Sequence, residues 1–136
     1  MNKKLGTILL IDDNEADNFF HHRTIQEADC CQEIKVFRDA EEALRFFKSA
    51  PESFKPDLIF LDIHMPGLNG WEFLEEYKQL PEAQKADTLL VMLSTFPDPE
   101  DWKKAEHDLH LSGYLKKPLD KENLTKILKE FFPQIF

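Results

Sequence analysis

The chain lacks any apolar run that approaches the roughly 20 residues of a membrane-spanning helix. Its N-terminus has a basic start but only a short apolar run, with acidic residues straight after it, which matches a signal peptide poorly. Only two cysteines are present, and because Cys30 and Cys31 are adjacent we expect no structural disulfide between them. These absences predict a cytoplasmic protein without a membrane partner.

Basic charge is also scarce. The sequence has 17 Lys and Arg residues against 26 Asp and Glu residues, so the formal net charge is −9. A negative protein does not offer the basic face that nucleic-acid binding requires, so direct binding to nucleic acid is disfavoured. The charge fits a protein that has other proteins as partners.

What the chain does contain is enough apolar material for one core. It has 136 residues, of which 42% are hydrophobic and 12 are Phe. This length suits a single compact domain and leaves little room for a second one. We expect one domain over residues 1–136, with a core from about residue 6 to residue 132 and no effector domain.

Five short apolar runs are spaced along the chain, and each is followed by a segment with helical periodicity. The runs are Thr7–Ile11, Ile34–Phe37, Leu58–Leu61, Thr88–Leu93 and Gly113–Lys116. Alternating strands and helices imply right-handed crossovers and a parallel sheet that is covered on both faces. Continuous apolar runs are typical of strands buried in this way. The sequence therefore predicts an α/β protein with a doubly wound (βα)5 parallel sheet.

The helices are predicted from capping residues and apolar spacing. Asp39, Asn69, Asp98 and Asp120 are the expected helix starts, and Pro99 suits a first helical position. The stretch from Pro81 to Asp87 reads as an irregular loop. Two apolar faces are expected to point inward: Ala16, Phe19, Phe20, Ile25 and Ala28 in the first helix, and Trp102, Ala105 and Leu109 in the fourth.

His21 and His22 are adjacent and so do not share a helix face. We expect both side chains to be exposed.

Polar side chains follow four of the five predicted strands. Asp12 and Asp13 follow the first strand, Asp62 the third, Ser94 the fourth, and Lys117 the fifth. Ligands bind outside the carboxyl ends of such strands, so these groups are expected to converge on one rim. Three carboxylates packed together repel one another, and Mg²⁺, which prefers oxygen ligands, would relieve that repulsion.

A lysine and a hydroxyl near a metal also suit the oxygens of a phosphoryl group. A carboxylate can act as a nucleophile toward phosphorus and form an aspartyl phosphate. Asp62, which is central in this arrangement, is the expected nucleophile.

Four motifs resemble the receiver domain of two-component response regulators. They are LLIDDNEAD, PDLIFLDIHMPGLNGWEFL, VMLST and GYLKKPLDKENL, and they occur in order over nearly the whole chain. The resemblance implies a flavodoxin-like sheet of order 2-1-3-4-5. It implies a protein that accepts a phosphoryl group in a phosphorelay and is not an enzyme beyond its own phosphorylation and dephosphorylation.

Carried over residue by residue, the resemblance implies a phosphoacceptor and a metal site. Asp62 accepts the phosphoryl group from a histidine kinase or a histidine phosphotransfer protein. Asp13, Asp62 and the backbone carbonyl of His64 bind Mg²⁺, and Asp12 contributes through a water.

The resemblance also implies a switch. Lys117 pairs with a phosphoryl oxygen, and the peptide bond before Pro118 is cis. Ser94 supplies a hydroxyl that moves to the phosphoryl group, and Tyr114 turns inward, which reshapes the surface for a downstream protein target. The resemblance leaves open a monomer or a phosphorylation-dependent dimer.

Two positions depart from the family pattern. His64 lies two residues after Asp62, and Phe96 lies two residues after Ser94. These positions tune hydrolysis in the family. Our hypothesis is that the two rings restrict the attacking water and lengthen the lifetime of the phosphoryl group.

Each of these residues has a plainer interpretation. Asp12 and Asp13 could serve only a helix N-terminus, Asp62 could form a turn, Lys117 could be a surface lysine, and Tyr114 could be a static aromatic. A phosphatase of the haloacid-dehalogenase type is the alternative function. It is disfavoured because His64 occupies the place of that family's second Asp. Relay, target binding and a phosphate sink remain open as downstream roles.

Overall fold

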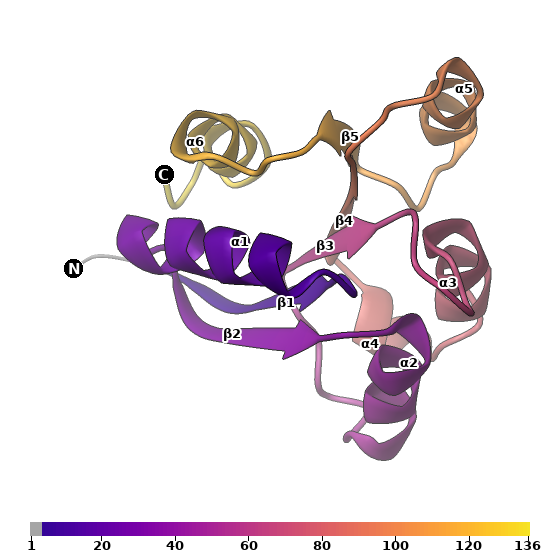
Figure 1. Cartoon of the computed structure of the whole chain (residues 1–136). Helices are drawn as coiled ribbons and strands as arrows, with labels where there is room; N and C mark the ends of the chain where they lie inside the picture. The colour runs from indigo at the N-terminus through magenta and orange to yellow at the C-terminus, as the bar shows by residue number, and fades with distance from the viewer. Residues whose placement is uncertain (1–3) are drawn as a thin grey trace.

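The computed structural model describes residues 4–136, and its strands form one parallel sheet (Figure 1). The sheet has five strands in the order β2-β1-β3-β4-β5. Their bounds are Leu5–Ile11 (β1), Cys31–Phe37 (β2), Leu58–Asp62 (β3), Leu89–Ser94 (β4) and Gly113–Lys116 (β5). The predicted flavodoxin-like order is confirmed, although β1 and β2 begin earlier than predicted.

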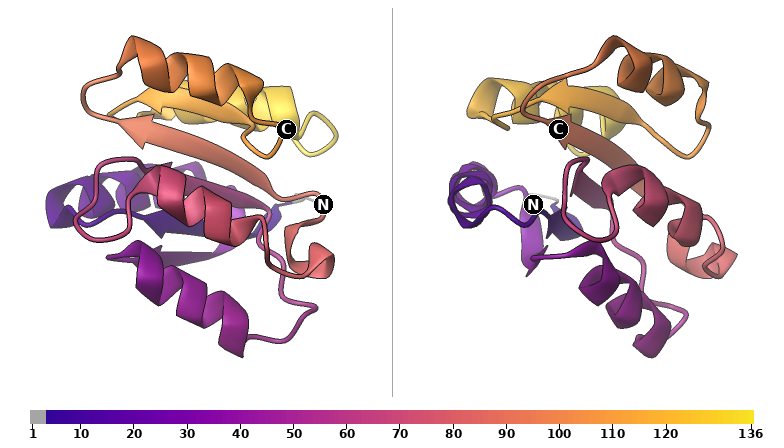
Figure 2. Two further views of the ribbon diagram at one scale, coloured as in Figure 1. Left: turned by 90° about the vertical axis from the view of Figure 1, so that its right-hand side faces the viewer. Right: turned by 45° about the vertical axis from the view of Figure 1, so that its right-hand side comes forward.

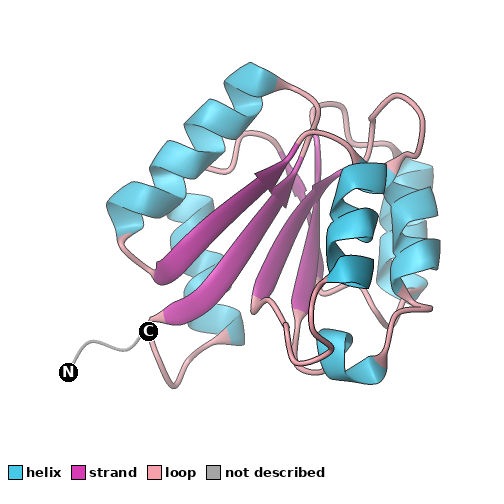
Figure 3. Ribbon diagram, turned by 90° about the horizontal axis from the view of Figure 1, so that it is seen from below, coloured by secondary structure: helices cyan, strands magenta, loops and turns pink. Residues whose placement is uncertain are grey.

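Helices cover both faces of the sheet (Figures 2 and 3). Their bounds are Glu15–Ala28 (α1), Ala40–Ser49 (α2), Gly70–Tyr77 (α3), Glu82–Lys85 (α4), Pro99–His107 (α5) and Lys121–Phe131 (α6). Helices α1 and α6 pack on one face, and α2, α3 and α5 lie on the other. None of the helices within residues 4–136 is long and apolar enough to cross a bilayer.

The helix starts follow the predicted caps. The side chains of Asp39, Asp98 and Asp120 each accept a hydrogen bond from a backbone N–H in the first turn. Asn69 and Glu72 form a reciprocal capping box, in which each side chain accepts from the other's backbone N–H at 2.9 and 3.0 Å. These caps begin each helix just past the sheet edge where the strands end.

Helix α4 lies in the segment that was predicted to be an irregular loop, so that prediction was wrong. Gln84 explains the difference, because its side chain is buried and donates a hydrogen bond to the carbonyl of Phe47 at 2.9 Å. A four-residue helix carries too little apolar periodicity for a sequence pattern to reveal it.

The predicted inward face of α1 was also wrong. Ile25 is buried as expected, but Phe19 is 72% exposed, and Asn18 and His21 are buried in its place. The prediction that His21 is exposed is therefore wrong as well. Backbone groups explain the change, because the Asn18 side chain donates to the Asp12 carbonyl and the His21 side chain accepts from the Leu119 N–H.

Helix α5 differs from its prediction in a similar way. No residue of α5 is buried, and Trp102 lies half exposed over the ring of Tyr114. Leu109 is 99% exposed and lies beyond the end of the helix. Ala105 alone packs partly against the core, so the expected inward face is reduced to one small side chain.

Candidate functional site

Three carboxylates meet at the carboxyl edge of the sheet. Asp12 and Asp13 follow β1 directly, and Asp62 ends β3, whose Leu61 pairs with Ile11 of β1. This register brings one carboxylate oxygen from each residue within 4.8 Å of the others. Asp12 and Asp62 are buried, and Asp13 is exposed. The convergence predicted from the strand ends is present.

Lys117 lies at the centre of this cluster. Its Nζ is 2.7 Å from Asp12 Oδ2, 3.3 Å from Asp62 Oδ1 and 2.8 Å from Asp17 Oδ2. The side chain is only 7% exposed. Burial alone would lower the pKa of Lys117, but the carboxylates of Asp12 and Asp17 outweigh it and raise the pKa. The ammonium therefore stays charged.

One ammonium does not balance the carboxylates around it. Burial, followed by the negative charge of Asp12, raises the pKa of Asp62 to about 7, with Lys117 acting in the opposite direction. A hard divalent cation with oxygen ligands would relieve this repulsion. The residues present therefore fit Mg²⁺, with Asp12, Asp13 and Asp62 as the carboxylate donors.

The turn after β3 brings a helix close to Asp62. Gly67 has a φ of +75°, which favours glycine. A Cβ on Gly70 would lie 2.8 Å from both the Asp62 carbonyl oxygen and the Ile63 Cα, so only glycine allows this approach. The Gly70 N–H also donates to the Ile63 carbonyl at 2.9 Å. The close approach of Gly70 and its hydrogen bond to Ile63 thus fix the backbone around Asp62.

Ser94 and Tyr114 lie on adjacent strands behind the cluster. Ser94 is the last residue of β4. Tyr114 lies in the neighbouring strand β5, where it pairs with Met92 of β4. Both side chains are buried, and within residues 4–136 neither hydroxyl has a hydrogen-bond partner. Burial raises the pKa of Tyr114, so the phenol stays protonated. These two hydroxyls are polar groups held without partners close to the site.

His64 and Phe96 stand at the mouth of the site. They line a cleft of about 630 Å³ together with Asp13, Asp62 and Lys117. His64 is exposed, and Phe96 is 80% exposed. The peptide bond between Lys117 and Pro118 is cis. All the residues predicted for the site therefore lie in or beside one region of the structure.

Sequence reasoning missed three residues of α1 that contact this region. Asp17 pairs with Lys117, Asn18 donates to the Asp12 carbonyl at 2.8 Å, and His21 accepts from the Leu119 N–H at 3.1 Å. The sequence contains one indication of these contacts, because positions 17 and 21 share a helix face with Ile25. Phe19 and Phe20 favour a different inward face, so apolar periodicity alone does not reveal these contacts.

The fold and the site together define a flavodoxin-like α/β protein with a candidate divalent-metal site at the carboxyl ends of β1 and β3. The response regulator receiver domain matches residues 8–129, so the chain belongs to this family. Receiver domains accept a phosphoryl group in two-component systems, generally bind Mg²⁺ through acidic residues, and act as signalling proteins.

Individual relatives and solved structures agree with this family assignment. The chain is 30% identical to the response regulator Rcp1 of Synechocystis over 125 residues, which cover 90% of this chain and 83% of that protein. A two-component response regulator from Cytophaga hutchinsonii superposes with a TM-score of 0.85 at 30% identity, covering 96% of this chain and 99% of the other. The chemotaxis response regulator CheY4 of Vibrio cholerae superposes with a TM-score of 0.75 at 27% identity, covering 95% and 100%.

Proposed function

We propose that Asp62 is the phosphoacceptor of this receiver domain. The observation that carries the proposal is a buried carboxylate, 4% exposed, that lies 3.3 Å from the Lys117 ammonium and beside two further carboxylates. The donor is a phosphohistidine on a histidine kinase or a histidine phosphotransfer protein. One Asp62 oxygen attacks phosphorus, the P–N bond breaks, and its electron pair stays on the imidazole nitrogen of the donor.

The other residues divide the work around the transferred group. Asp13, Asp62 and the His64 carbonyl would hold Mg²⁺, with Asp12 acting through a water. When bound, Mg²⁺ supplies positive charge that neutralises the phosphoryl oxygens. Lys117 supplies a further positive charge at one phosphoryl oxygen, which requires its ammonium to turn from Asp12 and Asp17 toward Asp62.

Ser94 and Tyr114 form the switch in this proposal. The Ser94 hydroxyl has no partner within the described residues, so a phosphoryl oxygen on Asp62 would supply its missing hydrogen bond. Movement of Ser94 frees space toward Tyr114, which packs against Trp102 of α5 with ring centroids 4.4 Å apart. The surface of α5 and β5 then changes for a downstream protein, either as a monomer or as a dimer formed on phosphorylation.

The test is incubation with Mg²⁺ and acetyl phosphate, followed by intact mass spectrometry. We expect wild type to gain the mass of one phosphoryl group, and Asp62→Asn to gain none. An equal gain in both proteins would place the acceptor elsewhere, and no gain in wild type that binds Mg²⁺ would contradict the proposed function.

We further propose that His64 and Phe96 slow the loss of the phosphoryl group. Both rings line the cleft through which water reaches Asp62. Removing one ring opens that path, so His64→Ala and Phe96→Ala should each lose the phosphoryl group faster than wild type. The decay of the phosphorylated mass over time measures this rate, and an unchanged rate in His64→Ala would remove His64 from the proposal.

A further inference from the structure

Helix α1 turns a polar side toward the segment that carries Lys117. Asp17 contacts the Lys117 ammonium at 2.8 Å, and His21, one helical turn later, contacts the backbone of Leu119. Two side chains of one helix therefore hold both the side chain of Lys117 and the main chain two residues beyond it.

The contact made by His21 is buried and specific. The side chain is 1% exposed, and the Leu119 N–H donates to its Nε2 at 3.1 Å. Because Nε2 accepts, it carries no proton, and the neutral imidazole keeps its proton on Nδ1. A charged imidazolium has no lone pair and could not accept this bond. A buried N–H without a partner is costly, so no apolar side chain can replace the imidazole without loss.

The charges that face His21 agree with a neutral ring. Burial lowers the pKa of His21, and the Lys117 ammonium lowers it further, while Asp17 and Asp12 act in the opposite direction. The net direction keeps the acceptor lone pair available.

The segment from Lys117 to Leu119 is held by contacts from several elements. The Lys117 N–H donates to the Ser94 carbonyl at 2.8 Å, the Leu119 N–H donates to His21, and the Leu119 side chain is fully buried in the core against α6. Hydrogen bonds to the main chain of this segment also include one of 3.4 Å from the Asn123 side chain to the Pro118 carbonyl, and among them the bond to His21 is the one that comes from α1. Without it, the main chain of the segment is held by β4 and α6, and only the Lys117 side chain, through its pairs with Asp17 and Asp12, still joins the segment to α1 and the end of β1.

We propose that His21 is a positioning residue for phosphoryl transfer to Asp62, acting through Lys117. By accepting the Leu119 N–H, it sets the distance between α1 and the segment 117–119, and so places the ammonium over the carboxylate that receives the phosphoryl group. The inference rests on the proposed function of Asp62.

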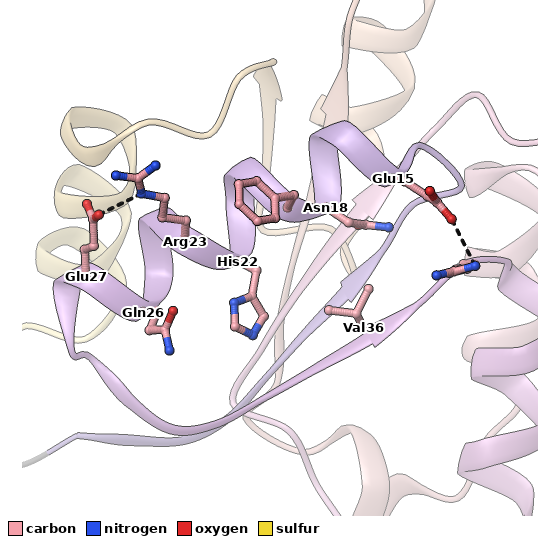
Figure 4. Close-up of a pocket in the computed structure, with 9 residues that line it drawn as sticks. Glu15, Asn18, His22, Arg23, Gln26, Glu27 and Val36 are labelled. Atoms are coloured by element: carbon pink, nitrogen blue, oxygen red, sulfur yellow. Dashed lines mark hydrogen bonds and ion pairs between the residues drawn. The ribbon is translucent and has the colours of Figure 1, made fainter.

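The chain offers a matched control in the next residue. His22 lies on the same helix but lines a groove of about 590 Å³ between α1 and β2, where Val36 lies opposite (Figure 4). Its side chain makes no hydrogen bond within residues 4–136. A substitution at His22 therefore makes the same chemical change on the same helix without touching the segment 117–119.

The test compares three variants with wild type. His21→Leu removes the acceptor, His21→Gln places an amide oxygen near the position of Nε2, and His22→Leu is the control. Each is titrated with Mg²⁺ alone and then with beryllofluoride, a mimic of the phosphoryl group, in the presence of Mg²⁺. Phosphorylation by acetyl phosphate is followed by intact mass. Melting curves confirm that each variant is folded at the assay temperature.

We expect His21→Leu to bind beryllofluoride about tenfold more weakly, the loss that one buried hydrogen bond represents. It should also accept the phosphoryl group more slowly, while its Mg²⁺ affinity stays unchanged. His21→Gln should recover most of the loss, and His22→Leu should match wild type. If His21→Leu does not fold, His21→Asn, whose acceptor falls short of Leu119, takes its place and should show the same weakening.

A second series asks whether the effect passes through Lys117. In a Lys117→Ala background, His21→Leu should cause no further loss, because the ammonium it positions is gone. An equal loss in both backgrounds, or wild-type behaviour of His21→Leu, would overturn the inference while leaving Asp62 as phosphoacceptor. Failure of wild type to accept a phosphoryl group would overturn the proposed function itself, and the inference with it.

Discussion

The two ends of the site are held by different kinds of contact. On the α1 and α6 side, the buried side chains of Ile25, Leu124, Ile127 and Leu128 join both helices to the sheet. On the other side, α5 buries no residue. Polar contacts tie α5 and its C-cap to α3 and its C-cap. Trp71 Nε1 donates to Asp101 Oδ1 at 2.9 Å, and Lys78, directly after α3, pairs at 2.8 Å with Asp108, directly after α5.

This difference divides the proposed site residues into two groups. Asp12 and Lys117 belong to the apolar, firmly packed half, together with the α1 contacts that hold them. Ser94 and Tyr114 lie next to the half that ends in α5, where Trp102 covers Tyr114. Elements that move in signalling are drawn from the less stable parts of a fold. We infer that metal and phosphoryl binding depend on the half that contains α1 and α6, which we call the firm half. The conformational response depends on the half that contains α5, which we call the loose half.

The largest expected effect comes from a pair of substitutions, one in the buried core and one at a half-exposed residue of α5. Ile25→Ala removes a fully buried side chain from the firm half and should lower the free energy of unfolding by about 2–4 kcal/mol. Trp102→Ala removes a half-exposed ring of α5 and should cost about 1 kcal/mol, mainly the tilted ring contact with Tyr114. Urea denaturation of both variants measures the two values. Equal costs would mean that α5 is packed as firmly as α1.

The packing of α6 and α2 could be predicted from the sequence, whereas the packing of α1 could not. Leu124, Ile127 and Leu128 repeat at helical spacing and are buried, and Ala43, Leu44 and Phe47 do the same in α2. Such a pattern predicts burial because the side chains on the core side of these helices pack against apolar side chains.

The inward side of α1 meets polar backbone at the sheet edge. His21 is buried because the N–H of Leu119, which is 98 positions away, needs an acceptor. No periodicity encodes a contact of that kind. The carboxylates were predictable for the opposite reason, since Asp12, Asp13 and Asp62 follow apolar strands whose ends must share one edge.

The second largest effect on stability is expected from Mg²⁺ binding at the carboxylate cluster. Binding would relieve the repulsion between carboxylates at the ends of β1 and β3, and so should stabilise the folded state. At a Mg²⁺ concentration tenfold above its Kd, the gain is about 1.4 kcal/mol, or a rise of about 5 °C in Tm. Differential scanning calorimetry with and without Mg²⁺ measures this, and Asp13→Asn serves as the control with a reduced rise. An unchanged wild-type Tm would speak against a metal site in the cluster.

The polar ties of α5 give the next smaller effect. Lys78→Met removes the pair with Asp108, in which the Lys78 and Asp108 side chains are 27% and 14% exposed, together with a more exposed pair with Glu75. We expect a cost of about 0.5–1 kcal/mol because the pair is only partly shielded from water. Amide hydrogen exchange should localise this cost, with faster exchange in α5 and unchanged exchange in α1. Lys126→Met, which removes an exposed pair with Glu122 on α6, is the control and should leave both helices unaffected.

Uniform acceleration across the protein in Lys78→Met would contradict the idea that α5 is a separately held unit. It would show instead that α3, which ends directly before Lys78, transmits the loss to the sheet.

The smallest effect concerns the pH dependence of the firm half. Burial lowers the pKa of His21 below its unfolded value of 6.5, so the unfolded chain binds more protons at this residue than the folded chain between the two pKa values. Stability from His21 is therefore complete above pH 6.5 and is lost as the pH falls through that window. His21→Gln keeps an acceptor but cannot bind a proton, so its stability should fall less than that of wild type from pH 7.5 to pH 5. The free energy of unfolding at each pH is measured by urea denaturation. The difference between the pH dependences of the two proteins isolates the contribution of His21, because Asp62 and the other acids contribute equally to both. Parallel curves would mean that the ring accepts its proton as readily in the folded protein as in the unfolded chain, and that α1 holds Leu119 without a neutral imidazole.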